Sequence, residues 1–279
     1  MRRIKKYNHP LVKRHLSKCL IVCLLICLSA CEKEIDIDYH QVEPIYVVEA
    51  SVSNSGMVAR ISQTNAMDDN TSTSDISQAI VTVTGNDGTN EKLNYSRNGY
   101  YRASKKGTPG VEYKIDVELD GHHFTSTSIM QQQPKMNEFR FIRKKIMTEW
   151  FQMGDLRIQD LPNEDNWYFM HIYRNDLGYR WAVLSDRNNP SKELQQLFSF
   201  FREGDDNNDT LHEGDRLHIE IRAIDLRSYD YLYSMQVMES SGTNPIANFA
   251  GGCLGYFSAF GQITYDCIYH AADVVTEED

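Results

Sequence analysis

Residues 113–119 read Tyr113-Lys114-Ile115-Asp116-Val117-Glu118-Leu119, and their side chains alternate strictly between apolar and polar. Successive side chains of a β-strand point to opposite faces of the sheet, so this alternation is typical of a strand with one buried face. Asp120-Gly121 follows as a turn, and residues 124–129 read as a second strand. The stretch therefore predicts a β-hairpin.

The same pattern of short strands and turn residues extends toward the N-terminus. Gly85-Asn86-Asp87-Gly88 is a strong hairpin signal, and Gly107-Thr108-Pro109-Gly110 is a turn. We expect further strands at residues 47–52, 57–61, 80–84 and 100–104. Short strands at regular spacing are typical of a small sandwich. Residues 45–130 are therefore predicted to form an immunoglobulin-like or transthyretin-like β-sandwich domain.

A second β-rich domain is predicted over residues 136–272. The polar stretch 131–135, without periodicity, marks the boundary before it. Expected strands lie at residues 139–146, 151–158, 167–173, 179–184, 197–201 and 217–224. The stretch 167–173 is apolar on both faces, which predicts a central strand. The fold class is therefore mainly β.

One main helix is predicted near residues 226–239, with Asp225 as its N-cap and Gly242 as its C-terminal stop. Tyr229, Leu232 and Tyr233 share one face of this helix with Gln236. An aromatic face of this kind serves either core packing or ligand contact, and core packing is the commoner use. We expect core packing here.

The N-terminus predicts secretion and a lipid anchor. Residues 1–30 carry seven Lys/Arg and no Asp/Glu, and their apolar run at 19–28 is ten residues long. A membrane span needs about 20 residues, so the segment fits a signal peptide. Leu28-Ser29-Ala30-Cys31 resembles the bacterial lipobox, which implies cleavage before Cys31 and diacylation of its sulfur. The alternative is an ordinary signal peptide with a chance cysteine at the cleavage site.

The tether at residues 31–44 is acidic, with Glu32, Glu34, Asp36 and Asp38 close to Cys31. It is either a solvated linker or, by resemblance, the export signal that sends Bacteroidetes lipoproteins to the cell surface. Without residues 1–30 the chain has 22 basic and 39 acidic residues, a net charge of −17. Nucleic acid is an unsuitable partner for so acidic a chain, because its negatively charged phosphates bind Lys and Arg. We expect attachment to the outer membrane, facing the exterior.

Two cysteines, Cys253 and Cys267, remain in the mature chain besides Cys31. In an oxidising compartment they form either a disulfide or two buried free thiols on neighbouring strands. A zinc site is disfavoured because no CxxC or HxxxH partners accompany them.

The sequence carries only weak signals of a reactive site or a metal site. Asp205, Asn207 and Asp209 match the first alternating positions of a calcium loop, but Thr210 replaces its glycine and Arg216 its bidentate glutamate. A solvated hairpin tip is the better interpretation. The sequence has no Walker loop or Gly-x-Ser-x-Gly elbow, and its histidines lack metal-ligand spacing. We expect no cofactor and no enzymatic activity.

One C-terminal segment resembles a known family. Residues 244–252 read Asn-Pro-Ile-Ala-Asn-Phe-Ala-Gly-Gly and residues 254–259 read Leu-Gly-Tyr-Phe-Ser-Ala. This is similar to the signature of a Bacteroidetes lipoprotein family known as domain of unknown function 4249. Its positions in this chain are Asn244, Pro245, Asn248, Gly251, Gly252, Leu254, Gly255, Tyr256 and Phe257. Glycine and proline favour a structural role for this segment over direct ligand contact.

The resemblance implies a function, because members of this family are often encoded beside TonB-dependent outer-membrane receptors. It implies no catalytic residues. We therefore expect a non-catalytic binding or accessory subunit for TonB-dependent nutrient uptake, held in the membrane by acylated Cys31. The alternative is a surface adhesion module.

Overall fold

The computed structural model describes residues 44–64, 76–159, 161, 164–187, 192–202, 210–241 and 245–277. The predicted signal peptide, Cys31 and all of the tether except Pro44 lie outside these ranges. Among the described residues, no helix is long and apolar enough to cross a membrane.

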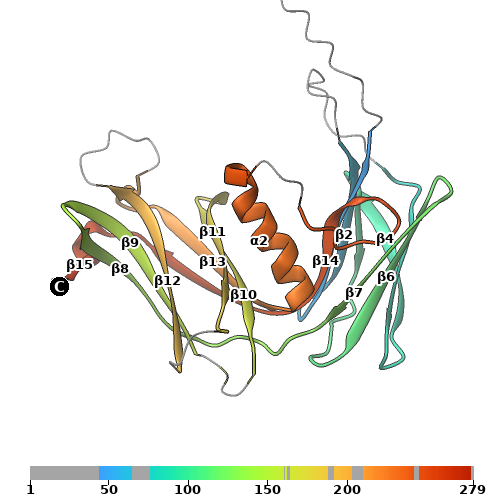
Figure 1. Ribbon diagram of the computed structural model, residues 1–279, viewed down its shortest axis with the longest axis horizontal. Coiled ribbons are helices and arrows are strands. Elements are labelled where there is room, and N and C mark those ends of the chain that lie inside the picture. Colours follow the sequence, from blue (N-terminus) through green and yellow to red (C-terminus); the bar gives the residue numbers. More distant parts are fainter. Residues whose placement is uncertain are drawn as a thin grey trace, which may run out of the picture. The chain divides into compact units, whose positions relative to one another are not determined.

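The first half of the described chain contains seven strands (Figure 1). They are β1 (Tyr46–Ser53), β2 (Gly56–Gln63), β3 (Ile80–Gly85), β4 (Asn90–Arg97), β5 (Tyr100–Ala103), β6 (Glu112–Leu119) and β7 (His122–Ile129). The hairpin predicted from residues 113–129 is β6–β7, with Val117 opposite Phe124. Strand β4 was missed because its sequence is mostly polar and Leu93 is its one fully buried residue.

The second half of the described residues contains eight further strands, one long helix and one short 3-10 helix. They are β8 (Met136–Ile146), β9 (Glu149–Gln159), β10 (Trp167–Arg174), β11 (Leu177–Ser185), β12 (Glu193–Arg202), β13 (Arg216–Ile224), α2 (Leu226–Ser241), β14 (Leu254–Ile268), the short 3-10 helix η1 (Ala271–Asp273) and β15 (Val275–Glu277). The mainly β fold with a sandwich, a second β-rich part and one main helix is confirmed.

The strands of the described ranges form two sheets. The larger has eleven strands in the order β11-β10-β13-β14-β1-β2-β5-β4-β3-β6-β7, and the smaller has four in the order β12-β9-β8-β15. Strand β10 lies between β11 and β13, as its two apolar faces predicted. Strand β14 pairs with β1 in parallel and with β13 antiparallel, so it joins the two halves of the larger sheet.

In the part of the chain that the structure describes, three clusters of buried side chains form the core. The first fills the sandwich, and it includes Phe257 and Ala259 of β14. The second lies between the four-stranded sheet and the β10–β13 end of the larger sheet. The third is small and lies under α2, where Phe169, Leu232 and Phe260 meet. A fully buried side chain such as Phe257 contributes roughly 2–3 kcal/mol through burial.

Strand β14 belongs to both halves, which the boundary at residues 131–135 did not anticipate. Its N-terminal half packs into the sandwich, and Ile263 and Cys267 pack against the second cluster. The connector from β7 to β8 crosses β14 at Gly261, where an added Cβ would lie 2.6 Å from the Cα of Gln133. The Gln133 side chain also donates to the carbonyl of Gln262 at 2.8 Å. Glycine at position 261 permits this crossing.

The two cysteines correct a sequence-based expectation. Cys253 is buried in the sandwich core, and Cys267 packs against the second cluster. Cys253 immediately precedes the fifteen-residue strand β14, Cys267 lies near its far end, and both are free. A disulfide needs Cα atoms within about 7 Å, whereas an extended strand rises about 3.3 Å per residue. The disulfide alternative is therefore wrong and the free-thiol alternative holds, except that one strand, β14, connects the two thiols instead of two neighbouring strands.

Candidate functional site

The signature segment lies at the junction of β7, α2 and β14. The side chain of Asn248 is buried, and its amide oxygen accepts the backbone N–H of Phe257 at 2.8 Å. The Ser126 hydroxyl lies 2.9 Å from the same oxygen. The amide nitrogen of Asn248 donates to the carbonyl of Arg227 at 3.4 Å. One side chain thus connects three elements, which favours the structural interpretation of the signature.

Two signature glycines allow backbones to approach closely. Gly255 has φ +98°, and an added Cβ would collide with the carbonyl oxygen of Val48 on β1. Gly251 has φ +103°, and its Cβ would collide with the carbonyl of His123. Left-handed backbone of this kind is costly for other residues. These glycines bring β14 against the sandwich.

The other signature positions are less constrained. Gly252 has φ +89° with open space around it, Pro245 is half-buried, and the Leu254 side chain is exposed. Tyr256 stacks on Tyr231 of α2, with ring centroids 5.0 Å apart. Asn244 lies outside the described residues.

The start of α2 is held by its predicted cap. One carboxylate oxygen of Asp225 accepts the backbone N–H of Ser228 at 2.9 Å, as an N-cap should. The other accepts the backbone N–H of Ile129, at the end of β7, at 3.1 Å. Asp225 therefore caps the helix and fastens it to the sandwich.

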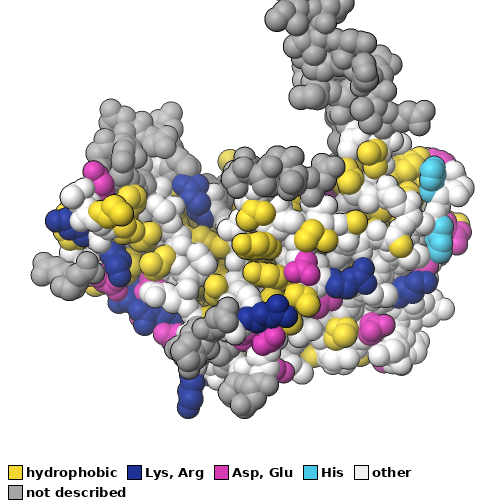
Figure 2. Space-filling view, in the orientation of Figure 1, with side chains coloured by type: hydrophobic (Ala, Val, Ile, Leu, Met, Phe, Trp, Pro, Cys, Tyr) yellow, Lys and Arg dark blue, Asp and Glu magenta, His cyan; other side chains and the backbone are white. Residues whose placement is uncertain are grey.

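Only part of the aromatic face of α2 is packed into the core. Leu232 is buried, and Gln236 accepts the backbone N–H of Val183 on the edge strand β11 at 3.3 Å. Tyr229 and Tyr233 stack on each other with centroids 5.6 Å apart, and Tyr233 is 48% exposed. Figure 2 shows hydrophobic side chains gathered over α2. The expectation of core packing was therefore wrong for Tyr233.

A pocket of about 500 Å³ opens beside the first turns of α2. Its lining combines two aromatic residues, Trp167 and Tyr229, with opposite charges on Arg187 and Asp230. The indole N–H of Trp167 is buried without a hydrogen-bond partner in the described structure. Arg187 lies over the Trp167 ring at 5.7 Å and pairs with Asp165 at 3.1 Å. We call this the Trp167 pocket.

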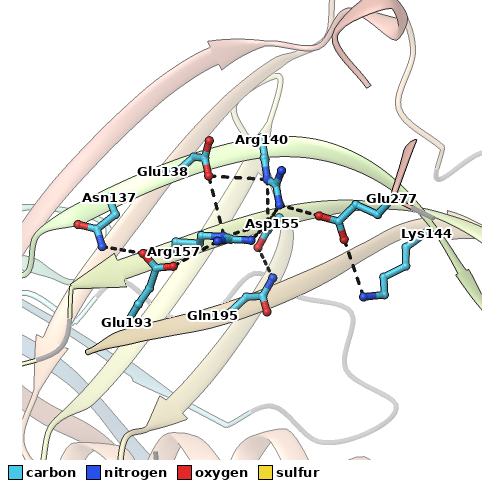
Figure 3. Close-up of polar contacts among 9 residues, drawn as sticks. All are labelled: Asn137, Glu138, Arg140, Lys144, Asp155, Arg157, Glu193, Gln195 and Glu277. Carbon is cyan, nitrogen blue, oxygen red and sulfur yellow. Dashed lines mark hydrogen bonds and ion pairs between the residues drawn. The ribbon is translucent and has the colours of Figure 1, made fainter. Parts of the chain in front are cut away.

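A charged network on the four-stranded sheet reaches this pocket (Figure 3). Asp155 is fully buried, and one of its oxygens accepts hydrogen bonds from Arg140 and Arg157 at 2.9–3.1 Å. Its other oxygen accepts the Gln195 amide at 2.7 Å, and Gln195 lines the pocket. Burial would raise the pKa of Asp155, but these hydrogen bonds outweigh it and lower the pKa.

The same network fastens the last described strand. Arg140 also contacts Glu277 of β15 at 2.6 Å, and Arg157 contacts Glu193 of β12 at 3.3 Å. These partners come from four strands, β8, β9, β12 and β15. Every charged side chain in the network has a partner. We therefore interpret the network as structural: it stabilises one wall of the Trp167 pocket.

Further along the same face of β10 from Trp167 lies a row of aromatic rings, which we call the aromatic platform: Phe169, His171, Tyr173, Trp181 and His218. Its centre is His171, whose ring lies 4.0 Å from Tyr173 and 5.9 Å from Phe169. Trp181 stands opposite His171 on β11, and His218 stands opposite Tyr173 on β13. The rings share the face of the sheet on which α2 packs, because Phe169 belongs to the cluster under the helix.

Charged groups border the platform. Glu220 stands opposite His171 and pairs with Arg222, while His218 contacts Asp266 at 2.7 Å. Arg222 also lies over the rings of Phe169 and Phe260 at 5.4 and 4.8 Å. Burial lowers the pKa of His171; Glu220 opposes this effect and Arg222 adds to it. His171 is therefore neutral at pH 7.

The histidines lack metal-ligand spacing in the sequence, yet the fold brings His171 and His218 to one surface. Alternate positions of β10 (169, 171 and 173) were a readable signal once the strand was predicted. Their partners on β11 and β13 follow from strand register, which the sequence does not state. Asp205, Asn207 and Asp209 lie outside the described residues. Within the described ranges, no group of three or more His, Cys, Asp or Glu is arranged to hold a metal ion.

Comparisons with known proteins give one informative match. No curated protein matches the chain. Among solved structures, a two-domain fibronectin type III segment from chicken tenascin is similar at a TM-score of 0.23 and 11% identity, covering 81% of this chain and 100% of that one. The family model for a domain of unknown function, DUF4249, matches residues 32–264. That match spans most of the sequence, and the chain therefore belongs to the DUF4249 family.

Proposed function

We propose that this protein is a lipid-anchored, non-catalytic binding subunit that works with a TonB-dependent receptor at the outer membrane. The lipobox-like residues at Cys31 and the acidic residues after it support the location. The pairing with a receptor rests on the character of the family described above. The described structure adds a surface suited to binding.

The observation that carries the binding role is the aromatic platform beside α2. Its rings lie on a paired sheet and remain in part accessible, with Trp181 39% exposed. Two of the ionisable groups there are already engaged, since His218 contacts Asp266 and Glu220 pairs with Arg222. Rigid aromatic side chains provide contact area at low entropic cost. Such a surface favours recognition over chemistry.

The location is tested by cell fractionation and protease treatment of intact cells. Wild-type protein should sediment with the outer membrane and be digested on intact cells, whereas Cys31→Ala should be released from the membrane. A Cys253→Ala variant serves as the control, because that thiol is buried in the sandwich and should not affect anchoring. Membrane retention of Cys31→Ala would contradict lipid anchoring.

The role is tested by deleting the gene and comparing growth on defined nutrients with attachment to surfaces. An uptake subunit should show a growth defect on at least one limiting nutrient, with attachment unchanged. Loss of attachment with normal growth would instead indicate the adhesion alternative, which the same anchored β-rich architecture would also serve.

A further inference from the structure

We propose that the aromatic platform binds a neutral carbohydrate chain, an inference that rests on the proposed binding role and names its ligand class. Pyranose rings have apolar C–H faces and hydroxyl rims. They therefore fit surfaces where aromatic rings lie beside hydrogen-bonding groups. The platform has this composition, and its rings extend over three neighbouring strands, β11, β10 and β13.

The arrangement of the aromatic rings supports a carbohydrate ligand. Phe169, His171 and Tyr173 stand at alternate positions of β10, and Trp181 lies 6.0 Å from Phe169. Tyr173 and His218 continue the row at 5.9 Å. Phe169 is buried under α2, and the rings of His171 and Tyr173 contact each other, so the accessible part of the row consists of Trp181, the His171–Tyr173 pair and His218. A row of this kind suits a chain of linked rings better than one compact ligand.

The hydrogen-bonding capacity of His171 also supports a hydroxyl-bearing ligand. No hydrogen bond to its imidazole is formed by any described residue, although the side chain is only half-exposed. A neutral imidazole presents one donor and one acceptor, which is what a hydroxyl group can satisfy. The neighbouring strand leaves room there, because Gly178 has no side chain and an added Cβ would lie 3.2 Å from Nε2 of His171.

The charged side chains that border the platform favour a neutral ligand. Glu220 and Asp266 supply carboxylate oxygens that accept hydrogen bonds from hydroxyls, and Asp266 has a largely exposed side chain. Two cations lie on this face of β13, and both are paired with carboxylates: Arg222 with Glu220, and Arg216 with Asp176 at 2.9 Å. An anionic ligand would therefore meet carboxylates without a free guanidinium. The charges favour a neutral polyhydroxylated ligand.

The test is calorimetric titration of the purified, membrane-extracted protein with four soluble hexasaccharides, namely cellohexaose, xylohexaose, mannohexaose and maltohexaose. At least one should bind. Trp181→Ala and His171→Ala should each weaken that binding by about tenfold or more, because each removes a stacking position. Gly178→Val should weaken it similarly, since it retains every ring but fills the space beside His171.

Trp150→Ala is the matched control, because Trp150 lies on β9, in the other sheet, against Arg143. It should leave binding unchanged, and unaltered thermal unfolding of all four variants excludes misfolding as the cause. The inference is overturned if no hexasaccharide binds, if the platform variants bind as wild type does, or if a lysine-rich peptide binds the platform and the sugars do not.

The test of carbohydrate binding can fail or succeed independently of the test of the accessory role. Co-purification of a receptor without binding of any hexasaccharide would overturn the carbohydrate assignment alone. Platform-dependent sugar binding without co-purification would support the assignment and contradict the receptor partnership.

Discussion

The amide oxygen of Asn248 accepts the backbone N–H of Phe257 at 2.8 Å, and both residues are buried where β14 enters the sandwich. This bond closes the loop between α2 and β14. Because Asn248 also contacts Ser126 and Arg227, the helix, the sandwich and the long strand depend on one side chain. The position of α2, and with it the space for the platform and the Trp167 pocket, follows from this junction.

Replacing Asn248 with Ala should therefore destabilise the protein. The backbone N–H of Phe257 would be left buried without its partner, which costs about 1–3 kcal/mol, in addition to the other lost contacts. Chemical denaturation should show this decrease in the free energy of unfolding. Asn94→Ala, at an exposed position of β4, is the control and should change stability by less than about 0.5 kcal/mol. Equal effects of the two changes would refute the role of Asn248.

The signature glycines should differ in their tolerance of alanine. Gly252→Ala meets open space and should cost about 1–2 kcal/mol for its left-handed backbone. Gly255→Ala carries the same backbone cost and also collides with Val48, so β14 must move away from β1. Thermal unfolding of both variants should rank Gly255→Ala as clearly the less stable. The reverse order would show that the parallel β1–β14 pairing is not close at this position.

The buried network around Asp155 predicts a pH-dependent contribution to stability. Its pKa is lowered in the folded state, so its contribution is complete at neutral pH and is lost as the pH falls below about 4. At pH 7, Asp155→Asn should be destabilising, by up to about 3–5 kcal/mol for a broken buried charge network. The difference in unfolding free energy between wild type and variant should shrink as the pH is lowered toward 3. A difference that stayed constant with pH would contradict the paired state of Asp155.

The two cysteines should remain reduced and slow to react. Burial raises the pKa of Cys253 to about 12, and burial together with Asp266 raises that of Cys267 to about 11. A thiol-specific reagent should therefore modify both only after unfolding, because the thiolate is the reactive form. Addition of a reductant should leave the midpoint of thermal unfolding unchanged. A lower midpoint with reductant would reveal a disulfide.

Much of the strand pattern could be read from local sequence, because alternation and turn residues report on half-buried strands directly. β6 and β7 follow from residues 113–129, and the N-cap of α2 from Asp225. β14 could not be read in the same way. Its start is rich in glycine, which locally resembles a turn, and its pairing with β1 joins residues about 200 positions apart.

The candidate sites were less accessible to sequence reasoning. His171 and Trp181 become neighbours only through the register of β10 and β11. Asp155 is buried because arginines from two strands cover it, and Glu277 joins them from the end of the described chain. The exposure of Tyr233 depends on how α2 is oriented against the sheet, which its aromatic periodicity does not determine.

Co-purification from native outer membranes is the most direct test of the proposed function. The protein would be captured under mild detergent through a C-terminal tag, with Cys31→Ala as the control for membrane placement, and its partners identified by mass spectrometry. We predict enrichment of one TonB-dependent receptor with the wild-type protein and its loss with Cys31→Ala. Absence of any such receptor from the wild-type sample would contradict the accessory role.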